Sequence, residues 1–203
     1  MNAKLFLSTV CLAAALAGCS STGSSDGPTQ AAPPDEAEMK QKWMEFATPG
    51  PAHQALNDRA GRWNLVVRMF QPGMAEPMES TATSETRWIM DGRYLFDDTV
   101  GDFMGQTFRG QGLLGYDNIK KCYVGSWIDN MGTGLATSEG QFDPKTKTFT
   151  YKSAAPDVMS GKYKPARSTE RIVDGNHWVM QMFQEGPDGK EAMMMEIEYT
   201  RAN

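Results

Sequence analysis

The chain has 203 residues, which is enough for one domain with additional segments. Acidic side chains outnumber basic ones, and the formal net charge is −5. This balance argues against the nucleic-acid-binding classes, because the phosphate backbone requires a basic face on its partner.

The N-terminal segment has the order of a secretory signal. Lys4 supplies a positive charge, and residues 5–17 form an apolar run that is too short to remain in a bilayer as a span. Leu16-Ala17-Gly18-Cys19 then resembles a bacterial lipobox. The resemblance implies a lipoprotein signal peptide over residues 1–18 and lipidation of Cys19. The alternative is an ordinary signal peptide that contains a cysteine by chance.

The residue after Cys19 predicts a location. Ser20 is not acidic, and in Gram-negative lipoproteins such a residue resembles the signal for the outer membrane. We therefore expect a bacterial envelope protein, attached to the periplasmic face of the outer membrane through lipid on Cys19. Residues 19–34 are rich in Ser, Gly, Pro and Ala without apolar periodicity, so they are predicted to form a disordered tether.

The cysteines predict a domain without an internal disulfide. Cys11 is removed with the signal and Cys19 is acylated, so Cys122 has no partner. A nucleophilic cysteine would need a histidine base, and the chain holds only His53 and His177. Cys122 is therefore predicted to be a small packed hydrophobic residue.

Residues 35–60 predict one or two short helices. Asp35 can act as an N-cap, and Met39, Trp43 and Phe46 follow at helical spacing. A second helix is predicted with Pro51 in its first turn and an end before Gly61. Both are expected to lie against an end or flank of the following domain.

Residues 61–203 read as a long meander of alternating strands. The ten predicted strands cover 62–70, 76–90, 94–102, 106–116, 122–130, 133–142, 146–153, 167–174, 177–184 and 192–201. An open meander of this length would leave two unpaired edges. We therefore predict a mainly β fold, an antiparallel up-and-down barrel of about ten strands. The pattern does not decide which side chains face the interior between Cys122 and Phe142.

Two sets of motifs resemble known families. Gly61-Arg62-Trp63 near the start of the meander and Arg201 near its end resemble the calycins, that is, the lipocalins and fatty-acid-binding proteins. In those barrels the tryptophan packs under the C-terminal arginine, a cation–π contact that closes one end. The resemblance implies that Trp63 and Arg201 are structural residues of a closed end.

The longer match is to the bacterial domain-of-unknown-function family 1579. It is carried by AGRWNL, GLLGYDN, WIDNMGTG, GPDGKE and MEIEYTR, and it covers residues 49–201. The resemblance implies a calycin-like barrel, often secreted or lipid-anchored, and it implies no activity. Related barrels that hold haem use a late-strand histidine, whereas the corresponding segment here is MMMEIEYTR, so no cofactor is expected.

The polar residues indicate little catalytic chemistry. His53 and His177 are predicted to be exposed or capping residues, and no metal site is expected. The polar groups expected near the interior are Asp129, Glu139, Glu170 and Arg171. Carboxylates on neighbouring strands would provide an acid/base pair, but an ion pair or simple solvent exposure is the default interpretation. The sequence therefore leans against an enzyme.

Methionine is unusually frequent, with 15 in the chain. Pairs such as Met180 and Met182 put two thioethers on one face of a strand, which fits core filling or an adaptable apolar interior better than a Cu(I) site. The predicted ligand-binding residues are Met69, Met78, Trp88, Phe103, Trp127, Met131, Met180 and Met182. We expect a small apolar ligand, the alternatives being an envelope interaction protein with a filled barrel and a hydrolase-type enzyme using interior carboxylates.

The turns predict which end of the barrel is open. The short polar turns at 91–92, 117–118, 143–145 and 174–176 belong to the end that holds Trp63 and Arg201. The longest connections belong to the other end and carry the apolar residues Met74, Phe103, Met104, Met131 and Met159. Such residues predict a portal or contact surface at that rim, or an inward-folded lid.

Overall fold

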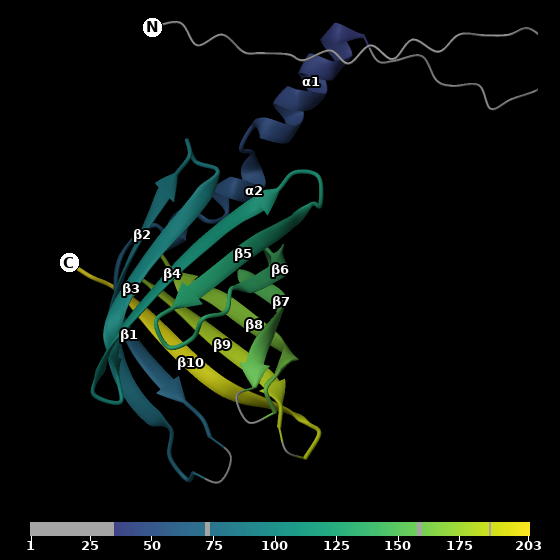
Figure 1. Ribbon diagram of the computed structural model, residues 1–203. Coiled ribbons are helices and arrows are strands. Elements are labelled where there is room, and N and C mark those ends of the chain that lie inside the picture. Colours follow the sequence, from purple (N-terminus) through teal and green to yellow (C-terminus); the bar gives the residue numbers. More distant parts are fainter. Residues whose placement is uncertain (1–34, 72–73, 158–159, 187) are drawn as a thin grey trace, which may run out of the picture. The chain divides into compact units, whose positions relative to one another are not determined.

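The computed structural model describes residues 35–71, 74–157, 160–186 and 188–203. The predicted signal peptide, the tether, Cys19 and Met159 lie outside the described residues. The elements are α1 (Glu36–Ala47), α2 (Pro51–Gln54), the 3₁₀ turn η1 (Asn57–Arg59), β1 (Gly61–Met69), β2 (Met78–Ile89), β3 (Tyr94–Phe103), β4 (Gln106–Asp117), β5 (Cys122–Asp129), β6 (Ala136–Asp143), β7 (Thr148–Asp157), β8 (Lys162–Asp174), β9 (His177–Glu185) and β10 (Glu191–Arg201) (Figure 1).

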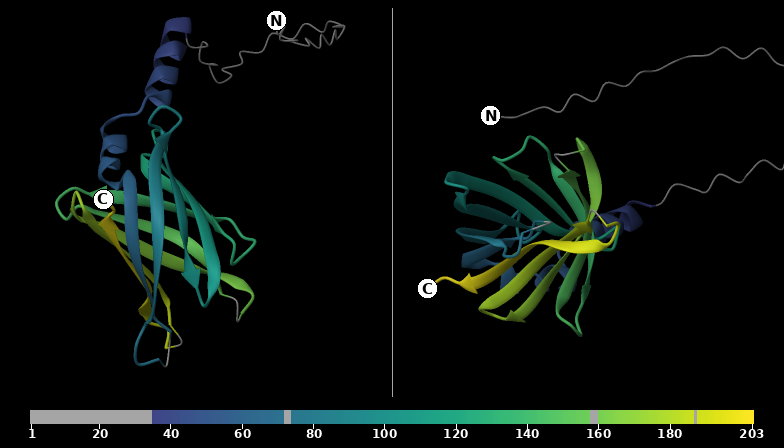
Figure 2. Two further views of the ribbon diagram at one scale, coloured as in Figure 1. Left: turned by 90° about the vertical axis from the view of Figure 1, so that its left-hand side faces the viewer. Right: turned by 90° about the horizontal axis from the view of Figure 1, so that it is seen from below.

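The ten strands form a closed antiparallel barrel, which confirms the predicted fold (Figures 1 and 2). Each strand pairs with its neighbours in the chain, and β1 completes the ring by pairing with β10 in the register Trp63 to Arg201. Closure leaves no strand edge unpaired, which is the physical reason that an alternating meander of this length folds on itself.

The strands alternate as their sequences predict. In β1, Trp63 and Leu65 are buried, whereas Arg62 and Asn64 between them are exposed. The structure also settles the region whose parity was open: alternate residues of β5 from Tyr123 to Asp129 and of β6 from Ala136 to Phe142 face inward.

One connection differs from its prediction. Residues 154–166 were expected to form a long loop, but β7 continues to Asp157 and β8 begins at Lys162. Backbone pairing extends past Pro156, which lies opposite Tyr163. Pairing depends on main-chain register as well as on apolar alternation, so the ladder continues where the side-chain pattern becomes irregular.

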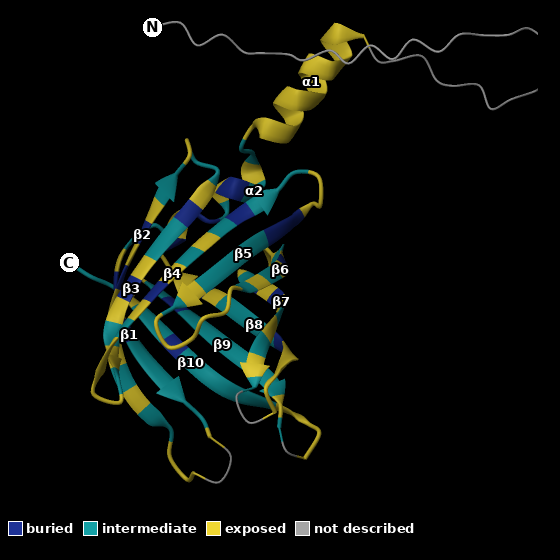
Figure 3. Cartoon of the chain, viewed as in Figure 1, coloured by how far each residue is buried: buried dark blue, intermediate teal, exposed yellow. Residues whose placement is uncertain are grey.

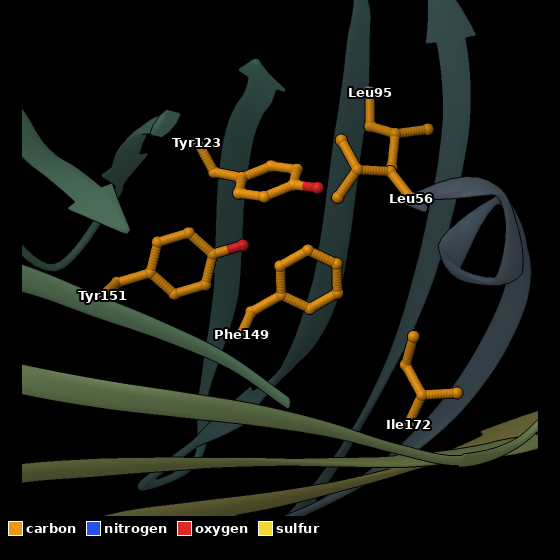
Figure 4. Close-up of a cluster of buried hydrophobic side chains, with 6 residues drawn as sticks. All are labelled: Leu56, Leu95, Tyr123, Phe149, Tyr151 and Ile172. Carbon is orange, nitrogen blue, oxygen red and sulfur yellow. The ribbon is translucent and has the colours of Figure 1, made fainter. Parts of the chain in front are cut away.

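The segment after α1 fills one end of the barrel. Leu56 is fully buried in a cluster with side chains from β3, β5, β7 and β8, namely Leu95, Tyr123, Phe149, Tyr151 and Ile172 (Figure 4). His53 is buried too, so its predicted exposure is wrong, but its predicted capping role is confirmed because Nδ1 accepts the Gly50 N–H. Burial lowers the pKa of His53, and the nearby Arg93 charge adds to this effect.

Helix α1 does not pack its apolar face on the barrel as expected. No residue of α1 is buried, and Met39, Trp43 and Phe46 are exposed (Figure 3). The hydrogen bonds that join α1 and the residue after it to the barrel use backbone: the Asn118 side-chain amide donates to the carbonyls of Glu45, Phe46 and Thr48. The helical spacing of the apolar residues therefore predicted α1 itself, but it did not predict that their side chains would remain exposed.

The predicted Trp63–Arg201 contact is present at this same end. The Arg201 guanidinium lies 4.3 Å from the centre of the Trp63 ring, and it donates to the carbonyls of Ala60 and Asp58. Gly61 has a φ of +141°, and a Cβ there would overlap Nη1 of Arg201. The glycine of the Gly-x-Trp motif is thus required by both backbone conformation and space.

Cys122 is buried at the start of β5, and burial raises the pKa of its thiol. This placement confirms the predicted packing role, because a thiol that remains protonated is a poor nucleophile.

Candidate functional site: the barrel cavity

The barrel encloses a cavity of about 550 Å³. All ten strands contribute to its wall, and Arg59 of η1 reaches it from the filled end. The volume falls within the range of typical small-molecule pockets. The protein's own side chains therefore leave part of the interior open, and the packed cluster around Leu56 fills one end.

A belt of apolar side chains forms much of the wall. It comes from the neighbouring strands β1, β10 and β9 and consists of Leu65, Val67, Met69, Met180, Met182, Met195 and Ile197. Thioether side chains have several rotatable bonds and polarisable sulfurs, so this belt can adapt its shape to a guest.

Six of the eight predicted ligand-binding residues line the cavity: Met69, Phe103, Trp127, Met131, Met180 and Met182. Met78 does not, although it pairs with Met69 in the β1–β2 ladder. Trp88 does not either: it packs beside the core cluster at the filled end, where its Nε1 donates to Asn57 Oδ1 at 3.1 Å. Alternation predicts which face a residue occupies but not how deep along the barrel it lies.

A polar group on β3 was missed by the sequence reasoning. Asp97 lies on the cavity wall, and its carboxylate accepts hydrogen bonds from Ser84, Thr86 and Thr99. The Thr86 and Thr99 bonds are both 2.6 Å long. The signal was present, because Leu95 sets the inward parity of β3 and Asp97 follows two residues later.

A buried ion pair occupies the boundary between the core and the cavity. Arg59 contacts the carboxylate of Glu170, and its Nη1 lies 3.5 Å from the Tyr151 hydroxyl. The guanidinium also stacks over the Trp178 ring at 4.6 Å. Burial is the largest single effect and opposes the charge on Arg59, but Glu170 together with Tyr151 and Tyr199 raises the pKa of the guanidinium. Arg59 is thus held as a cation by partners within the protein.

The inner end of the cavity, here called the floor, holds Asp97, Arg59 and Glu170 together with two aromatic residues. Trp178 and Tyr199 are stacked, with ring centres 3.4 Å apart, and both line the cavity. Burial raises the pKa of Tyr199, and the carboxylates of Asp97 and Glu170 raise it further. The buried Trp178 Nε1 has no hydrogen-bond partner among the described residues.

The rim opposite the filled end is partly apolar and partly acidic. Phe103 and Met131 line the cavity there, as predicted for the open end. Asp129 accepts hydrogen bonds from the Trp127 indole at 3.0 Å and from the Met131 N–H at 2.9 Å. Met74 and Met104 in the same set of connections are exposed rather than folded inward.

The remaining polar predictions do not assemble a catalytic site. Glu139 and Arg171 were expected near the interior, but both are exposed, and Glu139 pairs with Lys120 outside the barrel. Glu170 is engaged by Arg59, and Asp129 is engaged at the rim. Within the described residues no cluster of His, Cys, Asp and Glu could hold a metal ion. Neither described helix is long and apolar enough to cross a membrane.

A closed up-and-down barrel with an internal, largely apolar cavity defines the class of the protein: a calycin-like small barrel. The family described as protein of unknown function (DUF1579) matches residues 48–201, and the chain belongs to that family. No curated protein matches the chain.

One solved structure supports the fold. The crystal structure of Rv2717c from M. tuberculosis aligns with a TM-score of 0.56 at 15% identity, covering 77% of this chain and 100% of that one. A redesigned beta barrel aligns over 73% of this chain and 96% of its own at 10% identity, with a TM-score of only 0.38. At 15% identity, the likeness to Rv2717c concerns the fold alone.

Proposed function

We propose that the barrel binds a small apolar or amphipathic molecule in its cavity. The observation that carries the proposal is the space of about 550 Å³ within a belt of methionine and aliphatic side chains. A barrel built only as a structural element would gain stability by filling such a space, because empty apolar volume loses dispersion contacts. The cavity thus favours ligand binding over the filled-barrel alternative.

Filling the cavity tests this function. Ser80 faces the cavity from β2, and Thr81 beside it faces solvent. We expect Ser80→Trp to occupy the space and to weaken binding of the neutral dye N-phenyl-naphthylamine by more than about tenfold, a change of about 1.4 kcal/mol. Fluorescence titration measures the dye, and mass spectrometry of a solvent extract measures any co-purifying ligand.

Thr81→Trp is the matched control, because it adds the same ring to the outer face of the same strand. It should leave dye binding unchanged. Equal binding by wild type and Ser80→Trp, with both variants folded, would refute ligand binding in the cavity.

We further propose that the protein is attached to a membrane through lipid on Cys19, facing the periplasm from the outer membrane. The lipobox-like Leu16-Ala17-Gly18-Cys19 carries this proposal. The exposed apolar face of α1, with Met39, Trp43 and Phe46, supports it, because aromatic and apolar side chains are favoured at a bilayer interface.

Cys19→Ala should abolish both lipid attachment and membrane fractionation, because no sulfur remains to accept the acyl group. Labelled fatty-acid incorporation and separation of membrane and soluble fractions measure the two effects. Cys11→Ala, which changes a cysteine within the predicted signal, should leave both unchanged. A Cys19→Ala protein that still incorporates label and sediments with membranes would show that the lipid is attached to another residue.

A further inference from the structure

The charged side chains of the cavity wall are strongly biased in sign. Four are acidic and one is basic: Asp97, Asp102, Asp129, Glu170 and Arg59. The single base is already neutralised, since Arg59 contacts Glu170 and stacks over Trp178. The wall therefore offers no unpaired cation to an incoming ligand among the described residues.

Asp97, Asp102 and Asp129 all lack an ion-pair partner among the described residues, and Asp97 is the one on the inward face of β3 beside the buried Arg59–Glu170 pair and Tyr199. The oxygens of Asp97 accept from three hydroxyls, Ser84, Thr86 and Thr99, which stabilise the carboxylate without cancelling its charge. Among the described residues no lysine, arginine or histidine forms an ion pair with it. Asp97 is only half-buried and lies on the inward face of β3, so its accessible part faces the cavity.

The electrostatic effect of this arrangement is visible on a neighbouring group. The pKa of Tyr199 is raised first by burial and next by the carboxylates of Asp97 and Glu170. The same field opposes a negative charge on any acid placed on this floor. A fatty-acid carboxylate would thus be repelled at the floor, and the acids Asp102 and Asp129 nearer the rim would repel it on entry.

We propose that the cavity selects amphiphiles with a cationic amine head, which pairs with Asp97 while the hydrocarbon tail lies along the methionine belt. This inference rests on the proposed ligand-binding function and names the chemistry of the ligand. An ammonium group donates hydrogen bonds and carries the missing positive charge, and charge-assisted hydrogen bonds are the stronger kind.

Three probes of equal chain length isolate the effect of head-group charge. Dodecylamine, dodecanol and dodecanoic acid would each be titrated against the barrel loaded with N-phenyl-naphthylamine, with displacement of the dye as the readout. We expect the amine to bind about tenfold or more tightly than the acid, with the alcohol between them, because a desolvated charge pair is worth at least 1.4 kcal/mol.

Asp97→Asn removes the charge while keeping an oxygen that accepts from the hydroxyls. It should reduce the difference between amine and acid to less than about threefold, since the attraction and the repulsion at the floor disappear together. Asp98→Asn is the matched control, because Asp98 is adjacent on β3 but faces outward, near Gln111. It should preserve the wild-type ranking.

The outcomes separate this inference from the function beneath it. If wild type binds the neutral dye but prefers the acid, or does not distinguish the three probes, cationic selection is wrong and ligand binding stands. A ranking that is unchanged in Asp97→Asn also overturns the assignment to Asp97. If wild type binds neither the dye nor any probe, the proposed function fails, and the inference fails with it.

Discussion

Trp63→Ala is expected to destabilise the barrel by about 3–5 kcal/mol, the usual cost of truncating a buried large aromatic side chain. Trp63 is 1% exposed, lies edge-on against Trp178 and donates its Nε1–H to the Arg59 carbonyl at 2.9 Å. The change would open a cavity, leave that carbonyl unpaired and remove the ring beneath Arg201. Chemical denaturation followed by circular dichroism measures the loss.

Trp43→Ala provides the control, because Trp43 is 65% exposed on α1 and, among the aromatic rings of the described residues, contacts only Phe46. It should leave the denaturation midpoint unchanged within error. A Trp63→Ala protein with the midpoint of wild type would contradict the structural role of the closed end.

Arg59→Met should also destabilise the fold by about 3–5 kcal/mol, the cost of leaving one charge of a buried pair without its partner. Glu170 would remain largely buried beside Tyr151, with no cation to balance it. Unfolding of Arg59→Met, of Glu170→Gln and of the double variant forms a double-mutant cycle. The double variant should recover part of the loss, because it leaves neither charge behind.

Arg62→Met is the matched control for this pair. Arg62 and Glu85 form an ion pair 3.7 Å apart on the exposed face of the barrel, where water screens both charges. Its replacement should have little effect on unfolding. Strictly additive losses for Arg59→Met and Glu170→Gln would mean that the two side chains do not stabilise each other.

The path of the barrel could be predicted because its signals are local. Alternation in β1, from Trp63 to Met69, has the period of a strand, and the same holds for the other strands. Turn residues such as Asp143 stabilise hairpins by accepting nearby backbone N–H groups, here that of Lys145. The calycin-like contact of Trp63 with Arg201 was also predictable. The two residues lie on the first and the last strand, and these strands must pair if the barrel closes.

Depth along the barrel could not be predicted in this way. Trp88 and Trp127 both lie on inward faces, yet Trp88 packs against the filled end and Trp127 lines the cavity. The difference arises because residues 51–59 occupy one end, and the burial of Leu56 and Arg59 depends on side chains from distant strands. No local pattern in a short helix specifies such partners.

The sequence by itself determined the number of strands, their antiparallel order and the face on which most side chains lie, because periodicity and turn chemistry act over a few residues. Only the tertiary structure decided that Arg59 is neutralised by Glu170, that Asp97 is not neutralised and that about 550 Å³ remains open between them and the rim. Charge balance and cavity volume are properties of residues that are far apart in the chain. They are set only when all ten strands and the N-terminal segment are in place together.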